Sequence, residues 1–121
     1  MERITHFEIP TDKPQEAMEF YKNVFGWSYN QWGDQEYWLT TTGDNARPGI
    51  NGAIMKKRDP QQPVVNSINV VKIDKSIESI EKNGGTIVVP KQTLPGVGYL
   101  AYFKDLDNNI FGIIQEDHNA Q

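Results

Sequence analysis

Residues 6–27 read HFEIPTDKPQEAMEFYKNVFGW, and they place a strand, a helix and a helix stop next to one another. At the start of this stretch, Phe7 and Ile9 alternate with His6 and Glu8, which is the period of two expected of a strand with two different faces. We therefore predict that the two apolar side chains face a helix. The imidazole and the carboxylate should share the opposite face of the strand.

The helix that follows has its own signals. Asp12 is placed to cap it, with Gln15 as the partner in a capping box, and Pro14 is tolerated in a first turn, where its missing N–H is no loss. Gly26 stands where a left-handed C-terminal cap belongs. Apolar residues recur at i, i+3, i+4 and i+7, so one helical stripe should face the sheet: Ala17, Phe20, Tyr21 and Val24.

The second half of the chain repeats this order of elements. Asp74 can cap a second helix, and residues 50–54 and 110–114 both read Ile-x-Gly-apolar-Ile. A loop is expected around Pro90, Pro95 and Gly96, and a turn over 105–109. The sequence thus predicts an α+β fold of two βαβββ modules in tandem within one domain: module one at 1–55, a linker at 56–63, module two at 64–115 and a frayed tail at 116–121.

The composition excludes several classes of protein. The net charge of −4 argues against binding to a nucleic-acid backbone, which requires a basic face. The absence of cysteine excludes disulfides, thiolate catalysis and zinc-finger sites. No apolar run approaches the roughly 20 residues of a membrane span. We expect a cytoplasmic protein with neither nucleic acid nor membrane as partner.

Three stretches carry a family resemblance: His6 on the first strand, residues 17–27 (AMEFYKNVFGW) and residues 104–115 (KDLDNNIFGIIQ). Together they resemble the vicinal oxygen chelate superfamily, which includes glyoxalases, extradiol dioxygenases and bleomycin-resistance proteins. The family's Asp-Pro-Asp-Gly-Asn turn is altered here to Asp-Leu-Asp-Asn-Asn at 105–109. The resemblance implies an eight-stranded incomplete barrel, whose cup holds a ligand and is formed within one chain or between two.

The resemblance also implies where a divalent metal would be held. Family enzymes use up to four His or carboxylate side chains from the first and last strand of each module. Carried onto this chain, these positions are His6, Gly52, Ser67 (or Asn66 if the strand over 64–71 slips by one residue) and Gly112. Only His6 is a good ligand, and Glu8 beside it adds one carboxylate. We therefore predict no metal at the standard position and no other cofactor, with a divalent metal as the alternative.

The two glycines at former ligand positions have two interpretations. A glycine in a strand marks either the close approach of a ligand or the close packing of two backbones. We predict that His6 and Glu8 are the catalytic pair if the protein is an enzyme. The predicted ligand-binding set is His6, Glu8, Trp38, Gly52, Ser67, Asn69, Tyr102 and Gly112.

Three functions remain open at this point. The first is a small-molecule-binding protein that takes a partly apolar ligand in the cup without the usual metal. The second is an enzyme, a glyoxalase-like lyase or a dioxygenase, that uses a metal or an acid–base pair of His6 and Glu8. The third is a non-catalytic interaction protein whose cup is filled by its own side chains. A homodimer is expected, because family cups are commonly completed across a two-fold axis.

Overall fold

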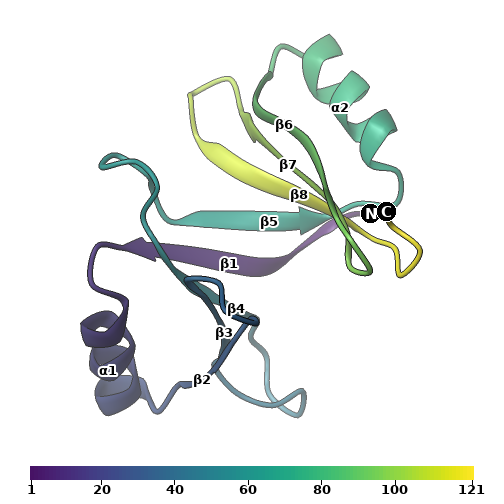
Figure 1. The fold of residues 1–121 in the computed structure, drawn as a ribbon. Helices are drawn as coiled ribbons and strands as arrows, with labels where there is room; N and C mark the ends of the chain where they lie inside the picture. The colour runs from purple at the N-terminus through teal and green to yellow at the C-terminus, as the bar shows by residue number, and fades with distance from the viewer. The chain divides into compact units, whose positions relative to one another are not determined.

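The computed structural model describes all residues from 1 to 121, and its elements follow the order βαβββ twice (Figure 1). This order confirms the predicted α+β fold class with its eight strands. The elements are β1 (Arg3–Thr11), α1 (Pro14–Phe25), β2 (Ser28–Gln31), β3 (Tyr37–Thr41), β4 (Asn51–Lys56), β5 (Val65–Asn69), α2 (Ile73–Lys82), β6 (Thr86–Leu94), β7 (Gly98–Lys104) and β8 (Ile110–Glu116).

The strands have the same order in both modules. In module one the sheet runs β1-β4-β3-β2, and in module two it runs β5-β8-β7-β6. The first and last strands of each module are parallel neighbours, and the other pairs are antiparallel. The chain forms two compact units, one of Thr5–Val64 and one of Val65–Gln121 with Met1–Ile4. Each half of the sequence therefore encodes four neighbouring strands with one covering helix.

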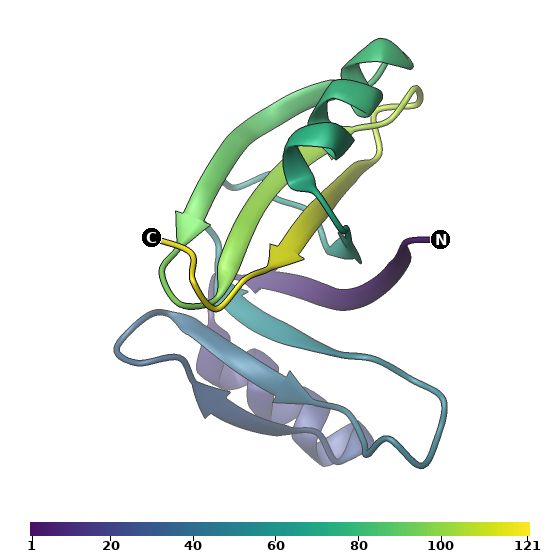
Figure 2. The same ribbon diagram turned by 90° about the vertical axis from the view of Figure 1, so that its right-hand side faces the viewer.

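The core of module two lies between α2 and one face of β6, β7 and β8, as Figure 2 shows. Its most buried members are Val70, Ile73, Ala101 and Ile113. Ile77 and Ile80 follow Ile73 along the inner stripe of α2 and pack against this core. Burial of a side chain such as Ile73 contributes about 1.5–3 kcal/mol. These apolar contacts fix the helix on the sheet.

Helix α1 turns a different stripe toward its sheet from the predicted one. Met18 is buried, and the ring of Tyr21 stacks on Trp27 with 4.8 Å between centroids. Phe20 and Val24, which we expected to face the sheet, are 57% and 55% exposed, so that prediction is wrong. The stacking on Trp27 orients the helix, because it holds Tyr21 inward and leaves the positions beside it outside.

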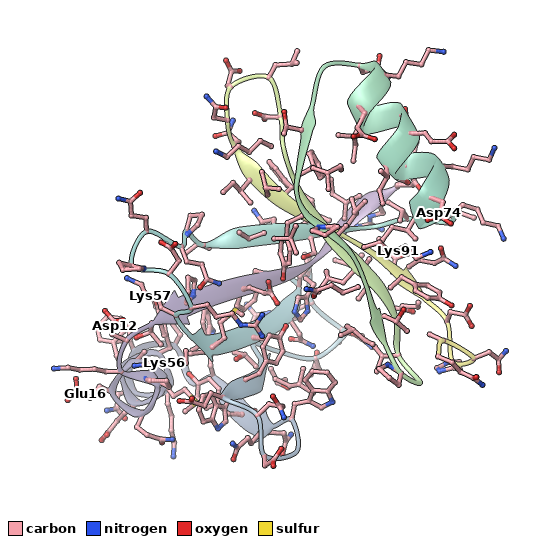
Figure 3. The ribbon with its side chains drawn as sticks, turned by 45° about the horizontal axis from the view of Figure 1, so that its top comes forward. Asp12, Glu16, Lys56, Lys57, Asp74 and Lys91 are labelled. Carbon is pink, nitrogen blue, oxygen red and sulfur yellow. The ribbon has the colours of Figure 1, made fainter.

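Both predicted N-caps are also wrong. The N-cap residues are Lys13 for α1 and Lys72 for α2, and neither makes a side-chain capping bond. Asp12 instead accepts a hydrogen bond from Lys56 Nζ at its backbone oxygen, 2.6 Å away. Asp74 lies in the first turn of α2 and pairs with Lys91 at 3.1 Å (Figure 3). Acidic groups are favourable near a helix N-terminus even when they are not the cap.

The ends and turns of module two are better ordered than the sequence indicates. β6 continues through Pro90 to Leu94, which an edge strand permits because a proline there need not donate to a neighbour. The predicted frayed tail is wrong as well. Asp117 N donates to Val97 O, Gly96 N donates to Ala120 O, and Ala120 is buried. The tail is therefore attached to the β6–β7 turn.

Two local predictions are confirmed. Gly26 caps α1 in the left-handed conformation, with φ of 80°, and its N–H donates to Lys22 O. Asp105 organises the turn before β8, because its Oδ1 accepts hydrogen bonds from the backbone N–H groups of Asp107 and Asn109. A hydrogen bond from the Asn109 side chain to the carboxylate is the main cause that lowers the pKa of Asp105, and the two backbone hydrogen bonds lower it further.

Gly52 lies where two neighbouring strands approach closely. It is paired with Phe7 in the β1–β4 ladder, and a Cβ at Gly52 would overlap the Phe7 ring and carbonyl oxygen. At Gly112, a Cβ would stand 2.5 Å from Ser67 Oγ. Of the two interpretations of these glycines, the structure favours the close packing of neighbouring strands. It does not favour open space left for a ligand.

We predict that Gly52→Ala lowers the free energy of unfolding by about 1–3 kcal/mol, because the added methyl group must displace Phe7. Urea unfolding followed by tryptophan fluorescence measures this change. The matched control is Gly43→Ala, since a Cβ at Gly43 meets no atom within 4 Å. Equal stability of the two variants would contradict the close packing at Gly52.

Candidate functional site

A polar cluster lies on one face of the module-one sheet. Paired residues of neighbouring strands present their side chains on the same face. In the parallel β1–β4 ladder, His6 is paired with Asn51 and Glu8 with Ala53. In the β3–β4 ladder, Leu39 is also paired with Ala53, and Tyr37 with Met55. We call this surface the His6 face; its residues are His6, Glu8, Tyr37, Leu39, Asn51, Ala53 and Met55.

Tyr37 connects His6 and Glu8 of β1. Its Oη donates to Glu8 Oε2 over 2.7 Å and lies 2.9 Å from His6 Nε2. Glu8 is only 6% exposed, so its carboxylate depends on such partners within the protein. The three residues form a continuous network, which we call the His6–Tyr37–Glu8 cluster.

The geometry of this cluster determines which atoms carry its protons. Tyr37 Oη has a single proton and gives it to Glu8, so it accepts the proton of His6 Nε2–H. Burial lowers the pKa of His6 below 6.5, and the charge of Glu8 opposes this only in part. The imidazole is therefore neutral at pH 7. Its Nδ1 makes no hydrogen bond within the chain and retains a lone pair.

Two of the predicted module-one residues lie on the other face of the sheet. Trp38 is paired with Ile54 in the β3–β4 ladder, and Gly52 is paired with Phe7. Both therefore face the side of α1, away from His6. Tyr37 and Asn51, which sequence reasoning missed, occupy the His6 face in their place.

Aligning the two Ile-x-Gly pentapeptides gives the wrong ladder partner for His6. In the structure, Ser67 is paired with Gly112, but the corresponding partner of His6 is Asn51 and not Gly52. The polar Asn51, which precedes the apolar run from Ala53 to Met55, was the signal that could have indicated the correct face. A shift of one residue places every side chain of a strand on the opposite face.

The predicted residues of module two do share one face of their sheet. Ser67 and Tyr102 are both paired with Gly112, and Asn69 follows Ser67 by two residues on β5. This pairing settles the register of the strand over 64–71 in favour of Ser67 over Asn66. Ser67 is buried, and Asn69 Nδ2 lies 3.4 Å from Glu116 Oε1.

The donors of this chain do not fit the metal site of the family enzymes. Nowhere do three or more His, Asp or Glu side chains gather closely enough to hold a metal ion. His6 Nε2 and Glu8 Oε2 already share Tyr37 as a partner, and the position opposite His6 is Asn51, whose Oδ1 accepts from Thr42 N. We therefore derive no chemistry from a metal at this site.

The sequence profile of the Glyoxalase/Bleomycin resistance protein/Dioxygenase superfamily matches residues 3–113, nearly the whole chain. The chain belongs to this superfamily. No curated protein matches this superfamily member significantly in sequence. Its two helices are also too short and too polar to cross a membrane.

Solved structures of low sequence identity share the fold of this superfamily member. A glyoxalase/bleomycin resistance protein/dioxygenase superfamily member from Vibrio splendidus 12B01 is 14% identical, with a TM-score of 0.68 over 96% of this chain and 100% of that one. Methylmalonyl-CoA epimerase from Mycobacterium tuberculosis is 13% identical, with a TM-score of 0.68 over 94% and 87%. Hypothetical protein BH1468 from Bacillus halodurans C-125 is 12% identical, with a TM-score of 0.67 over 99% and 98%.

We predict that His6 makes the stability of the fold depend on pH. Because the folded-state pKa lies below the unfolded value of 6.5, the unfolded chain binds the proton more readily. The stability that neutral His6 contributes is fully present above pH 6.5. It is lost as the pH falls toward the folded-state pKa. Urea unfolding between about pH 5.5 and about pH 7.5 should show that acidification lowers the free energy of unfolding more in wild type than in His6→Gln.

The matched control for this measurement is His118→Gln, which removes the other histidine of the chain from an exposed position. Parallel pH profiles for wild type and His6→Gln would contradict the proposed depression of the His6 pKa.

Proposed function

We propose that this superfamily member binds a small, partly apolar organic molecule on the His6 face of module one, without a metal at the family position. The His6–Tyr37–Glu8 cluster is the observation that carries this proposal. A neutral imidazole and a buried carboxylate, linked through one hydroxyl, form a fixed polar group beside apolar side chains. Sites for small molecules commonly combine an apolar lining with a few oriented polar groups.

The apolar part of the proposed site is supplied by the same face. Leu39 is 45% exposed although it is a large apolar side chain, and Ala53 and Met55 lie beside it in the ladder. An apolar portion of a ligand would cover the exposed part of Leu39 and remove it from water, with a gain of about 25 cal/mol for each Å² buried. Ala53 and Met55 are already buried and form the floor beneath it.

The polar part favours a ligand that donates a hydrogen bond. His6 Nδ1 carries a lone pair, and Glu8 contributes negative charge through Tyr37. A hydroxyl or amide N–H of the ligand would find an acceptor at Nδ1. Ser67, Asn69 and Tyr102, which share one face of module two with Gly112, form a second surface for which we propose ligand contacts.

Acid–base catalysis is the second candidate function, and the protonation state of His6 favours it. A neutral imidazole is the form that acts as a general base. On taking a proton at Nδ1, His6 would become an imidazolium whose charge is balanced by Glu8 through Tyr37. A lyase or isomerase that moves a proton next to a carbonyl group would use His6 and Glu8 in this way.

We also propose a cytoplasmic homodimer. Phe20, Val24 and Phe25 leave three large apolar side chains exposed along α1, and such a surface is suited to association with a second copy. Sedimentation equilibrium at micromolar concentration should give twice the mass of one 13.8 kDa chain. A single species of 13.8 kDa would argue against a dimer.

The proposed function predicts a ligand whose affinity depends on His6. A thermal-shift screen of small aromatic and aliphatic alcohols, amides and ketones against wild type should identify compounds that stabilise the fold. His6→Gln should weaken binding of such a compound about tenfold or more, since a lost hydrogen bond costs about 1–3 kcal/mol of binding free energy. Tyr37→Phe should also weaken binding, because the imidazole loses the partner that fixes its tautomer. His118→Gln serves as control. A compound that binds wild type and His6→Gln equally would refute the proposed site.

A further inference from the structure

A second concave surface lies in the connection between β3 and β4. Residues 42–45 and 47–49, together with Asn51, line a pocket of about 210 Å³. The pocket is smaller than the roughly 300–1,000 Å³ of sites for drug-sized ligands, so it suits one functional group rather than a whole molecule. It belongs entirely to module one.

The pocket offers hydrogen-bond donors without partners in the protein. Arg47 lines it, and its guanidinium forms no ion pair or hydrogen bond with another group of the chain. The backbone N–H groups of Gly43, Asn45 and Gly49 also donate to no other group of the chain. A guanidinium beside free backbone N–H groups is the donor set that binds carboxylate and phosphate oxygens.

The one carboxylate in the pocket does not reverse this preference. Asp44 Oδ1 accepts the N–H of Ala46 over 2.9 Å, so part of its acceptor capacity is used within the loop. Asp44 does not pair with Arg47, which leaves the arginine charge available. A cation site would need further carboxylate or histidine ligands, and the chain gathers no such group of three.

Asn51 connects this pocket to the His6 face. It lines the pocket and is also the ladder partner of His6, so the two backbones lie about 5 Å apart. Its Oδ1 accepts from Thr42 N over 2.9 Å, which attaches the end of the loop to β4. One ligand could thus place one group in the pocket while the rest of it lies along β4 toward His6 and Glu8.

We propose that the β3–β4 pocket binds an oxyanion, a carboxylate or a phosphate, through Arg47 and the free backbone N–H groups. This group would belong to the ligand of the His6 face, and in that respect the inference rests on the proposed function. It specifies the substrate class as small organic acids or phosphate esters that carry an apolar portion.

Titrations with sodium phosphate and sodium acetate, followed by the backbone amide signals of 15N-labelled protein, test the pocket itself. Wild type should show saturable shifts at Gly43, Asn45 and Gly49, and sodium chloride at equal ionic strength should not cause them. Arg47→Ala should raise the dissociation constant for the anion at least tenfold, and Arg47→Lys should raise it less. The control is Arg58→Ala, which removes an exposed arginine outside the pocket.

The relative strength of the two anions identifies the ligand class. Tighter binding of phosphate points to phosphate esters, and tighter binding of acetate points to organic acids. Shifts that do not saturate, or that persist unchanged in Arg47→Ala, would overturn the inference.

His6→Gln separates this inference from the proposed function. It should leave phosphate binding at the pocket unchanged and weaken only ligands that reach the His6 face. If phosphate binds through Arg47 but no compound depends on His6, the oxyanion pocket stands and the proposed function fails. If compounds depend on His6 but no anion shifts the loop, the pocket inference fails alone.

Discussion

The parallel pairing of β1 with β4 is the constraint on which the candidate site depends. It sets His6 opposite Asn51 and Phe7 opposite Gly52, and a slip of one residue would exchange the two faces of the sheet. Gly52 helps to fix this register, because only a residue without a side chain fits against the Phe7 ring and carbonyl. The packing of two backbones thus decides which polar groups face His6.

Tyr37 gives the cluster its chemical character. A histidine and a buried glutamate on the same strand face need partners, and one hydroxyl from β3 supplies a hydrogen bond to each. The imidazole is held neutral and in one tautomer, since burial lowers its pKa and Tyr37 occupies its Nε2. This arrangement places Asn51, Tyr37 and His6 on one face of the module-one sheet.

Membership of the superfamily establishes the fold but leaves the function to the site. The neighbours with solved structures are only 12–14% identical over nearly the whole chain, and at that level a shared fold carries no shared activity. For that reason the proposed ligand follows from Tyr37, Leu39 and Arg47 and from no relative.

The sequence by itself determined the repeated βαβββ order, the strand face shared by His6 and Glu8, the glycine cap at Gly26 and the Asp105 turn. These features are local, because periodicity, capping and turn chemistry act within a few residues. Only the tertiary structure decided that Tyr37 rather than Trp38 meets His6, that Asn51 rather than Gly52 is its ladder partner, and that α1 turns Met18 inward. Large side chains occupy both faces of β3, and in β4 only the polar Asn51 indicates the face of His6, so the local patterns leave the inner face of β3 open. That choice is made by strand register and aromatic packing between residues distant in the chain, which a local pattern does not contain.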